Sequence, residues 1–253
     1  MSFDERLVLD KESKENIIYD EHLVRYQLAA QISRGKRILD IACGSGYGSK
    51  ILAEAGAAKV VAIDRGAEAV GEARRNYGQE KIEFKVGDAE NIAESDREFD
   101  MVVSFETIEH LENPEKYLAE VARVLKTEGI FLASTPNREV FGQKNPYHSH
   151  EFTRGEFEQI LKKYFKNIFI LEQANGLASL IKSGEQGKIY FSAAEPLYFI
   201  AVCGNNDLKL SELFKESVVS VNPAALKRLR NNPVMKFVDK IYSIFFSSWR
   251  RAE

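Results

Sequence analysis

The chain has 253 residues, and its 44% hydrophobic and 29% charged residues are typical of one globular domain with a full-sized core, not of a disordered chain. A formal net charge of −3 provides no overall positive field that would hold a nucleic acid. The charged N-terminus is not a signal peptide and no stretch reaches the roughly 18 apolar residues of a membrane span, so we expect a cytoplasmic protein.

Short β-rich segments alternate with helical patterns in the first half of the chain. The β-rich segments are bounded by Gly, Asp or Pro, and the segments between them have apolar residues at helical spacing. This alternation predicts a mostly parallel sheet with helices on both of its faces. The predicted strands are residues 37–41, 59–63, 82–86, 99–104 and 130–134, and the predicted helices are residues 48–55, 66–77 and 114–125.

The second half of the chain has a different pattern. A loop rich in Asn, Pro and His follows residue 134, and a helix is expected over residues 153–164. Two apolar runs, 168–171 and 197–202, are expected to pair as an antiparallel hairpin at one edge of the sheet. The predicted fold is therefore α/β, with a seven-stranded, mostly parallel sheet and an antiparallel edge hairpin. Residues near 175–195 are expected to form an insertion over one face.

The last fifth of the chain is basic and amphipathic. From Pro223 onward it has seven Lys or Arg against two acidic residues, and its large apolar residues repeat at helical spacing. Such a helix docks on the core or makes a peripheral contact with an anionic membrane, which would place the protein at the inner face of that membrane. We divide the chain into an N-terminal helical lead-in (1–36), a main domain (37–205) and a basic amphipathic C-terminal helical region (206–253).

A glycine-rich segment, ILDIACGSGYG at residues 38–48, lies where the first strand should turn into a helix. Such a loop lets the backbone approach a ligand closely. Its last glycine, Gly48, follows the preceding one by two positions instead of three, which speaks against a nicotinamide or flavin site. Carboxylates stand at or after the ends of the first three strands, along the rim where an α/β sheet binds its ligand. These carboxylates are Asp40, Asp64 and Asp88.

Five segments in order resemble the motifs of class I S-adenosylmethionine-dependent methyltransferases, which are Rossmann-like proteins. They are ILDIACGSGYG, VVAIDRG, KVGDAENI, FDMVVSFETIEHL and RVLKTEGIFLASTPN, and the resemblance covers roughly residues 19–203. It implies S-adenosylmethionine as cofactor, with Asp64 accepting both ribose hydroxyls and Asp88 holding the adenine amino group. The cofactor-binding residues that it implies are Arg25, Asp40, Ala42, Gly44, Gly46, Asp64, Arg65, Asp88, Ala89 and Phe105.

Two further segments have a more specific resemblance. IIYDEHLVRY and NPYHSHEFTRGEF are similar to methyltransferases that accompany bacterial glycosyltransferases in making surface polysaccharides. This resemblance implies an O-methyltransferase whose acceptor is a sugar, a glycan or a lipid-linked saccharide intermediate, and it lets Arg25 pair with the cofactor carboxylate. A quinone or small phenolic acceptor is the alternative, and a binding module without turnover is the alternative of another class.

The acceptor side of the reaction needs a group that takes the hydroxyl proton. Candidate catalytic residues are Glu106, His110 and His148, whereas His150 is expected to be a cap or a hydrogen-bonded core residue. Together with Glu109 they also resemble the metal site of small-RNA 2′-O-methyltransferases, where an ion would bind acceptor oxygens. The sequence favours the metal-free version, because E-x-x-E-H-L also occurs in metal-independent relatives, and the balanced charge makes RNA the less favoured acceptor.

Overall fold

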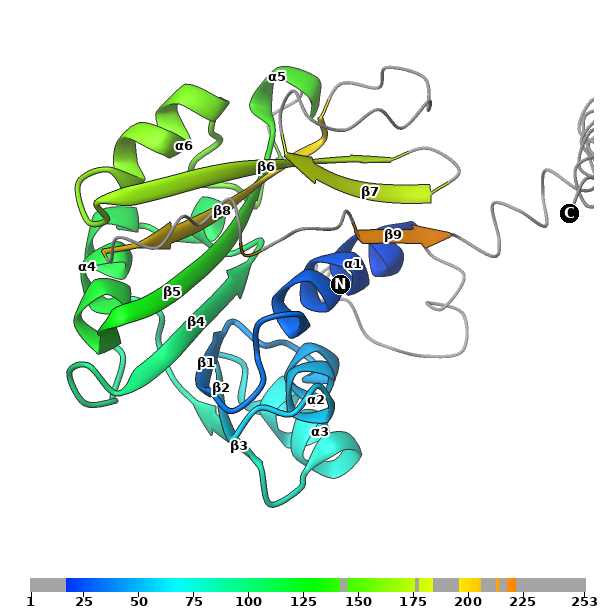
Figure 1. Cartoon of the computed structure of the whole chain (residues 1–253), viewed down its shortest axis with the longest axis vertical. Helices are drawn as coiled ribbons and strands as arrows, with labels where there is room; N and C mark the ends of the chain where they lie inside the picture. Colours follow the sequence, from blue (N-terminus) through cyan, green and yellow to red (C-terminus); the bar gives the residue numbers. More distant parts are fainter. Residues whose placement is uncertain are drawn as a thin grey trace, which may run out of the picture.

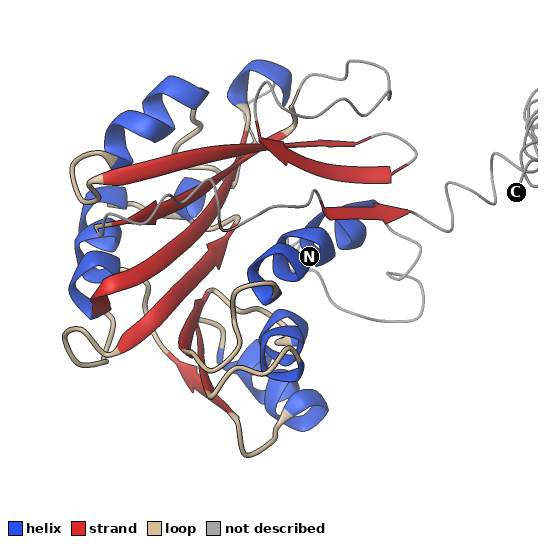
Figure 2. Ribbon diagram, in the orientation of Figure 1, coloured by secondary structure: helices blue, strands red, loops and turns tan. Residues whose placement is uncertain are grey.

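The computed structural model describes residues 17–141, 145–175, 178–183, 196–205, 213 and 218–221. Their strands form one sheet of nine, in the order β3-β2-β1-β4-β5-β8-β6-β7-β9, with helices on both faces (Figure 1, Figure 2). The strands are β1 (Arg37–Ile41), β2 (Lys59–Asp64), β3 (Ile82–Val86), β4 (Phe99–Phe105), β5 (Leu125–Pro136), β6 (Asn167–Asn175), β7 (Ala178–Ser183), β8 (Tyr198–Gly204) and β9 (Val218–Val221). The helices are α1 (Ile17–Ala30), α2 (Tyr47–Glu54), α3 (Ala67–Tyr77), the 3₁₀ turn η2 (Ile108–His110), α4 (Pro114–Val124), α5 (Arg138–Phe141) and α6 (Arg154–Leu161).

The strands β1 to β5 form the parallel part of the sheet. β1 lies at its centre, with β2 and β3 on one side and β4 and β5 on the other, and their pairings are parallel. The chain therefore runs outward from β1 to β3 and then returns past β1 to β4. In an open α/β sheet the ligand crevice forms at this reversal, outside the carboxyl ends of the two central strands. The topology thus places the candidate site at the carboxyl ends of β1 and β4.

Antiparallel strands complete the other part of the sheet. β8 pairs with both β5 and β6, and the pairing of β6 with β8 confirms the predicted hairpin. The hairpin does not end the sheet, because β7 pairs with β6 and β9 pairs with β7. β7 occupies part of the segment expected to be an insertion. The mostly parallel, Rossmann-like sheet that the sequence predicts is therefore present and is extended by these two strands.

The strand β9 lies within the region for which the sequence predicts a helical structure, so that expectation is wrong for Val218–Val221. The segment is rich in valine, whose β-branched side chain favours an extended backbone. The basic helix expected from Pro223 onward lies outside the described residues, and its docking on the core or on a membrane stays a prediction. Among the residues that the structure describes, no helix is both long enough and apolar enough to cross a membrane.

Two apolar cores lie on the two faces of the sheet. Successive residues of a strand point to opposite faces. Ile38 accordingly packs in the core beneath α1, α2 and α3, whereas Leu39 packs in the core beneath α4 and α6. Val24 and Leu28 of α1 are buried in the first of these cores. The described part of the predicted N-terminal lead-in therefore packs on this face of the sheet, beside α2 and β9 (Figure 1).

Capping side chains fix the starts of the two helices, α5 and α6, that follow β5. Thr153 and Glu156 form a reciprocal capping box at the start of α6, with the Thr153 N–H donating to Glu156 Oε2 at 2.8 Å. The sequence predicts a loop after β5, but Asn137 Oδ1 accepts the Glu139 N–H at 3.0 Å and the short helix α5 begins there. The loop that carries His148 is therefore held at its far end by a capped helix.

Candidate active site

The glycine-rich loop between β1 and α2 lies at the reversal point of the sheet. Its backbone is left-handed at Ala42 (φ 56°), Gly44 (φ 53°) and Gly46 (φ 83°). Gly46 admits no side chain, because an added Cβ would lie 2.7 Å from both Ala73 Cβ and a Phe84 ring carbon. The chain thus turns tightly from strand to helix at the crevice, as expected for a loop that cradles a ligand.

Asp40 is buried at the end of β1, beneath this loop. One carboxylate oxygen accepts from Tyr26 Oη (3.0 Å) and the other from Ser49 Oγ (2.6 Å). Burial raises the pKa of Asp40 to about 7, although the two hydrogen bonds lower it. Because both oxygens have partners inside the protein, the geometry supports a role in holding the loop against α1. A direct contact of Asp40 with the cofactor stays a prediction.

Gly48 allows Tyr26 to approach the loop. An added Cβ at Gly48 would lie 2.0 Å from a carbon of the Tyr26 ring. The same ring packs edge to face on Phe105 and Tyr47, with centroid distances of 5.0 Å and 5.6 Å. The last glycine of the motif is therefore required by the packing of α1, which brings the Tyr26 hydroxyl to Asp40.

Replacing Gly48 with alanine is expected to lower the free energy of unfolding by about 1–3 kcal/mol, because the Tyr26 ring must move from its packed position to make room for the added methyl group. Chemical denaturation followed by circular dichroism measures this loss. Gly155→Ala in α6 is the matched control, because an added Cβ there meets nothing within 4 Å. If Gly48→Ala and Gly155→Ala were equally stable, the packing of Tyr26 would not be what requires Gly48.

Asp64 and Asp88 lie along the same rim as the loop. Asp64 Oδ2 accepts the Gly44 N–H (2.9 Å) and Oδ1 accepts the Gly66 N–H (2.8 Å). A carboxylate oxygen has a second lone pair, so Asp64 can still accept hydroxyl donors. Asp88 follows β3 and is exposed, with Oδ1 accepting the Glu90 N–H at 2.8 Å. The structure therefore brings Asp64 to the glycine loop and leaves the Asp88 carboxylate open to solvent.

The other predicted cofactor-binding side chains differ in exposure. Arg65 is exposed directly after β2, and Ala89 is half-buried against the core beneath α4. Phe105 is buried at the end of β4, where its ring meets Tyr26. These three residues lie at or after the carboxyl ends of β2, β3 and β4, and their contact with the cofactor stays a prediction.

Arg25 of α1 is fully buried. Its Nε donates to Gln173 Oε1 (2.7 Å), and its guanidinium carbon lies 4.1 Å from the centre of the Tyr198 ring. Its Nη1 is 3.4 Å from Glu106 Oε1, but Nη1 and Nη2 have no hydrogen-bond partner. Buried side-chain donors rarely remain unsatisfied in a functional complex. The end of this side chain is therefore suited to a ligand group with acceptor oxygens.

Glu106 follows β4 with a left-handed backbone at φ 51°. Its N–H donates to the Ser134 carbonyl (3.2 Å), and its Oε1 accepts from the Ser134 hydroxyl (2.9 Å). These bonds from β5 hold the carboxylate beside Arg25. The sequence groups Glu106 with candidate metal ligands, but the structure places it outside the compact group formed by the other three.

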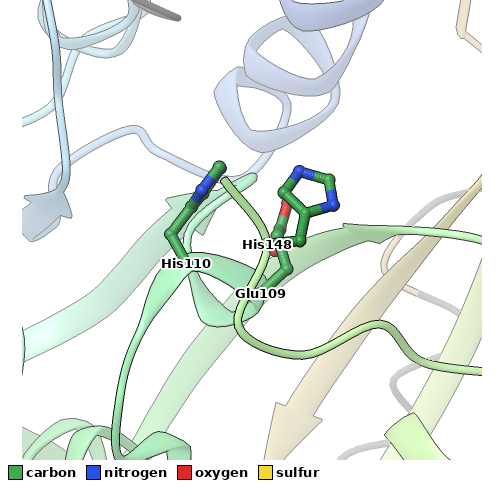
Figure 3. A group of neighbouring side chains, drawn as sticks. All are labelled: Glu109, His110 and His148. Atoms are coloured by element: carbon green, nitrogen blue, oxygen red, sulfur yellow. The ribbon is translucent and has the colours of Figure 1, made fainter. Parts of the chain in front are cut away.

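That compact group consists of Glu109, His110 and His148 (Figure 3). One ligand-type atom of each lies within 4.8 Å of the others. Glu109 and His110 come from η2, just after β4, whereas His148 comes from the loop before α6. The two imidazole rings meet edge to face, with centroids 4.8 Å apart. The structure thus brings together three candidate residues that the sequence places in two separate segments.

Backbone hydrogen bonds join these two segments. The N–H groups of Ser149 and His150 both donate to the Glu109 carbonyl, at 2.8 Å and 3.0 Å. The side chain of His150 is exposed and lies near Phe152. These two hydrogen bonds therefore fix the loop that carries His148 beside η2.

Each imidazole in the group is oriented by a neighbouring oxygen. His110 Nδ1 lies 3.0 Å from the Tyr147 carbonyl, which accepts only, so Nδ1 carries a hydrogen. His148 Nδ1 lies 3.6 Å from Glu151 Oε1, and its Nε2 lies 3.1 Å from Asn145 Nδ2. Such outer partners are typical of histidines that bind a metal or accept a proton.

Glu109 is the buried carboxyl of the group. Its Oε2 accepts from Thr135 Oγ1 at 3.2 Å, whereas its Oε1 is buried without a hydrogen-bond partner. Burial, and then the nearby Glu106 carboxylate, raise the pKa of Glu109 well above its usual value. An unsatisfied, buried acceptor next to two imidazoles is favourable only when a proton or a cation joins them.

Sequence reasoning missed the residues that hold these side chains in place. Glu151 was detectable in principle, because it follows His148 by three positions. The others come from distant strands, from α1 and, for Ser49, from α2, and no local sequence pattern identifies them. They are Glu21, Tyr26, Ser49, Ser134, Thr135, Gln173 and Tyr198.

Curated proteins are similar in sequence to part of this chain. A probable S-adenosylmethionine-dependent methyltransferase from Mycolicibacterium smegmatis is 32% identical over 155 residues, which are 59% of this chain and 59% of that protein. A ubiquinone biosynthesis O-methyltransferase from a Ruegeria species is 38% identical over 106 residues, 41% of this chain and 42% of that protein. The chain therefore spans about half the length of the curated relatives that it matches.

A solved structure has the same fold. The protein is an S-adenosylmethionine-dependent methyltransferase from Thermotoga maritima, described as a possible histamine N-methyltransferase, with a TM-score of 0.58 and 18% identity over 74% of this chain and 91% of that one. At this identity the likeness concerns the fold alone. Residues 32–189, which include the glycine loop and the group around Glu109, match the family described as "Methyltransferase domain". The chain therefore belongs to the methyltransferase domain family, within the class I S-adenosylmethionine-dependent methyltransferases.

Proposed function

We propose that the protein transfers a methyl group from S-adenosylmethionine to a hydroxyl oxygen of a sugar, a glycan or a lipid-linked saccharide intermediate. The observation that carries this proposal is the group of Glu109, His110 and His148 at the carboxyl end of β4. Methyl transfer to oxygen needs alignment with the sulfonium and removal of the hydroxyl proton. Two oriented imidazoles and a carboxyl group beside the crevice supply the groups for proton removal.

The donor is proposed to lie across the ends of β1, β2 and β4. Its methionine end carries a carboxylate and an ammonium group. Arg25 offers two nitrogens without hydrogen-bond partners, and Glu106 lies beside it at 3.4 Å, so the pair complements both charges. Asp64 is proposed to accept the ribose hydroxyls, and Asp88 with the Ala89 backbone to bind the adenine, as the motif resemblance implies.

Replacing Asp64 with alanine is expected to weaken S-adenosylmethionine binding by about 1.5–3 kcal/mol, the range for hydrogen bonds to a charged group. Isothermal titration calorimetry measures this loss. Asp100→Ala is the matched control, because Asp100 lies at the opposite end of β4, where it pairs with Lys126. Unchanged affinity in a folded Asp64→Ala protein would show that Asp64 does not bind the ribose.

The structure also favours a divalent ion at the same group. Glu109 Oε1 is a buried acceptor without a partner, and the two imidazoles present Nδ1 to protein oxygens. Outer-shell oxygens of this kind are typical of histidine ligands. We therefore propose Glu109, His110 and His148 as the ligand set, with the Asn145 amide moving away from His148 Nε2. An ion held there would bind the acceptor oxygen and lower the pKa of its hydroxyl group.

The choice of acceptor class is tested by transfer of labelled methyl groups. Methyl hexosides and bacterial glycan extracts represent the proposed acceptors, and catechol represents the phenolic class to which the quinone-pathway relatives point. Label on the sugars and not on catechol is the expected result. Label on catechol alone would overturn the sugar assignment and leave a phenol O-methyltransferase. Donor binding without label on any acceptor would favour a non-catalytic binding module.

A further inference from the structure

Two side chains from the antiparallel part of the sheet contact Arg25 of α1. Gln173 of β6 and Tyr198 of β8 are opposite each other in the register of these two strands. Opposite residues of an antiparallel pair lie on the same face of the sheet, and α1 covers this face. Gln173 is fully buried and Tyr198 is 9% exposed. Neither residue belongs to the five motif segments, so the motifs do not account for their contact with Arg25.

The Gln173 amide joins two groups of α1. Its Oε1 accepts from Arg25 Nε at 2.7 Å, and its Nε2 donates to the Glu21 carbonyl at 3.1 Å. A guanidinium only donates and a carbonyl only accepts, so both neighbours require the same orientation of the amide. Glu21 lies one helical turn before Arg25, and Gln173 spans the two. The amide therefore fixes the Nε side of the guanidinium.

The Tyr198 ring supports the face of the same guanidinium. The Arg25 guanidinium carbon lies over this ring, 4.1 Å from its centre, and such a contact is strongest where water is excluded. The Tyr198 hydroxyl donates to Glu21 Oε2 at 2.7 Å, which holds the ring in place. Within the described part of the chain, Nη1 and Nη2 of Arg25 have no hydrogen-bond partner. The contacts thus fix the plane of the guanidinium and leave its two-pronged end for a ligand.

We infer that Gln173 and Tyr198 are positioning residues that aim the Arg25 guanidinium at the carboxylate of the S-adenosylmethionine donor. This inference rests on the proposed function, in which Arg25 binds that carboxylate. A guanidinium makes two parallel hydrogen bonds to a carboxylate only when its plane and direction match. Both nitrogens are buried, so a ligand carboxylate reaches them once Glu106 turns toward the ligand's ammonium group. The Glu106 side chain is 16% exposed and lies 3.4 Å from Nη1.

The test compares the affinities of the full chain for S-adenosylmethionine and for its decarboxylated form, which lacks only the carboxylate. Gln173→Met keeps the length of the side chain but removes both amide bonds. It is expected to weaken S-adenosylmethionine binding about 10- to 50-fold, because the guanidinium loses its orientation, and to change the other affinity less than about twofold. Gln159→Met, the same change at an exposed position of α6, is the matched control and should resemble the wild type. Isothermal titration calorimetry measures both affinities.

Two variants of Tyr198 provide a second measurement that does not depend on the folding of Gln173→Met. Tyr198→Leu removes the ring beneath the guanidinium and is expected to cause the same selective loss of S-adenosylmethionine affinity. Tyr198→Phe keeps the ring and removes only the bond to Glu21, so it is expected to stay within about threefold of the wild type. Equal losses for both ligands in Gln173→Met and Tyr198→Leu would indicate structural support alone and would overturn the inference.

Arg25→Ala separates this inference from the proposed function. It is expected to bind S-adenosylmethionine no more tightly than the decarboxylated form, because the group that distinguishes them is gone. If Arg25→Ala kept the wild-type preference for the carboxylate, the proposed placement of the donor would be wrong, whatever the other variants do. If Arg25→Ala lost the preference while Gln173→Met and Tyr198→Leu kept it, Arg25 would bind the carboxylate without these two residues, and only the positioning role would be overturned.

Discussion

Replacing His148 with alanine is expected to lower the rate of methyl transfer by about 10²- to 10⁴-fold, the usual contribution of a positioned acid–base group. The His148 ring lies against His110 within the compact group, and Glu151 faces its Nδ1 at 3.6 Å. In the proposed mechanism the ring acts on the acceptor hydroxyl, either by taking its proton or by holding an ion next to it. Because the proposed donor contacts do not include His148, the loss should appear in kcat with donor affinity intact.

His150→Ala provides the matched control for this experiment. His150 lies on the same loop and donates to the Glu109 carbonyl through its backbone, which alanine retains. Its side chain is exposed, so the variant is expected to keep turnover within about twofold of the wild type. Initial rates with labelled donor and calorimetric titration give both quantities. Full activity of His148→Ala on an acceptor that the wild type methylates would contradict both roles of the imidazole.

The strands and helices of the parallel part could be predicted because each has a local signal. The strand 37–41 ends where the glycine loop begins, and the helix over 114–125 starts at Pro114 behind the Asn113 cap. The strand β7 lacked such a signal, since it lies in a glycine-containing segment, and the valine-rich segment of β9 was assigned to the helical region because a basic amphipathic tail follows it. The pairing of β7 with β6 and of β9 with β7 is a tertiary property.

The site was predictable to the extent that its chemistry lies in short motifs. Asp64, Glu109 and His110 follow the ends of strands, so their convergence follows from a parallel sheet. The residues that orient these side chains cannot be inferred from the parallel sheet. The Tyr147 carbonyl on His110 and the Thr135 hydroxyl on Glu109 come from separate segments. These outer contacts support the proposed ion, whereas the sequence alone favoured a base without metal.

Incubation with a chelator is expected to lower turnover by at least about 100-fold, and added Mn²⁺ or Mg²⁺ is expected to restore it. Glu109→Gln keeps the size of the side chain and an oxygen for Thr135, but it removes the charge that a cation requires. It is expected to weaken metal affinity about 10- to 100-fold and to regain turnover at high metal concentration. Metal content is measured by mass spectrometry of the purified protein and affinity by calorimetry.

Glu112→Gln is the matched control for Glu109→Gln. Glu112 lies just beyond η2 and is exposed, so the same change of charge occurs outside the group. This control should keep wild-type metal affinity, which would show that the effect at Glu109 arises from ligation and not from net charge. Full turnover in chelator, by a protein that contains no metal, would exclude the ion. His148, with Glu151 facing its Nδ1, would then remain as the metal-free base, and the buried Glu109 would carry a proton and hold the turn through its carbonyl.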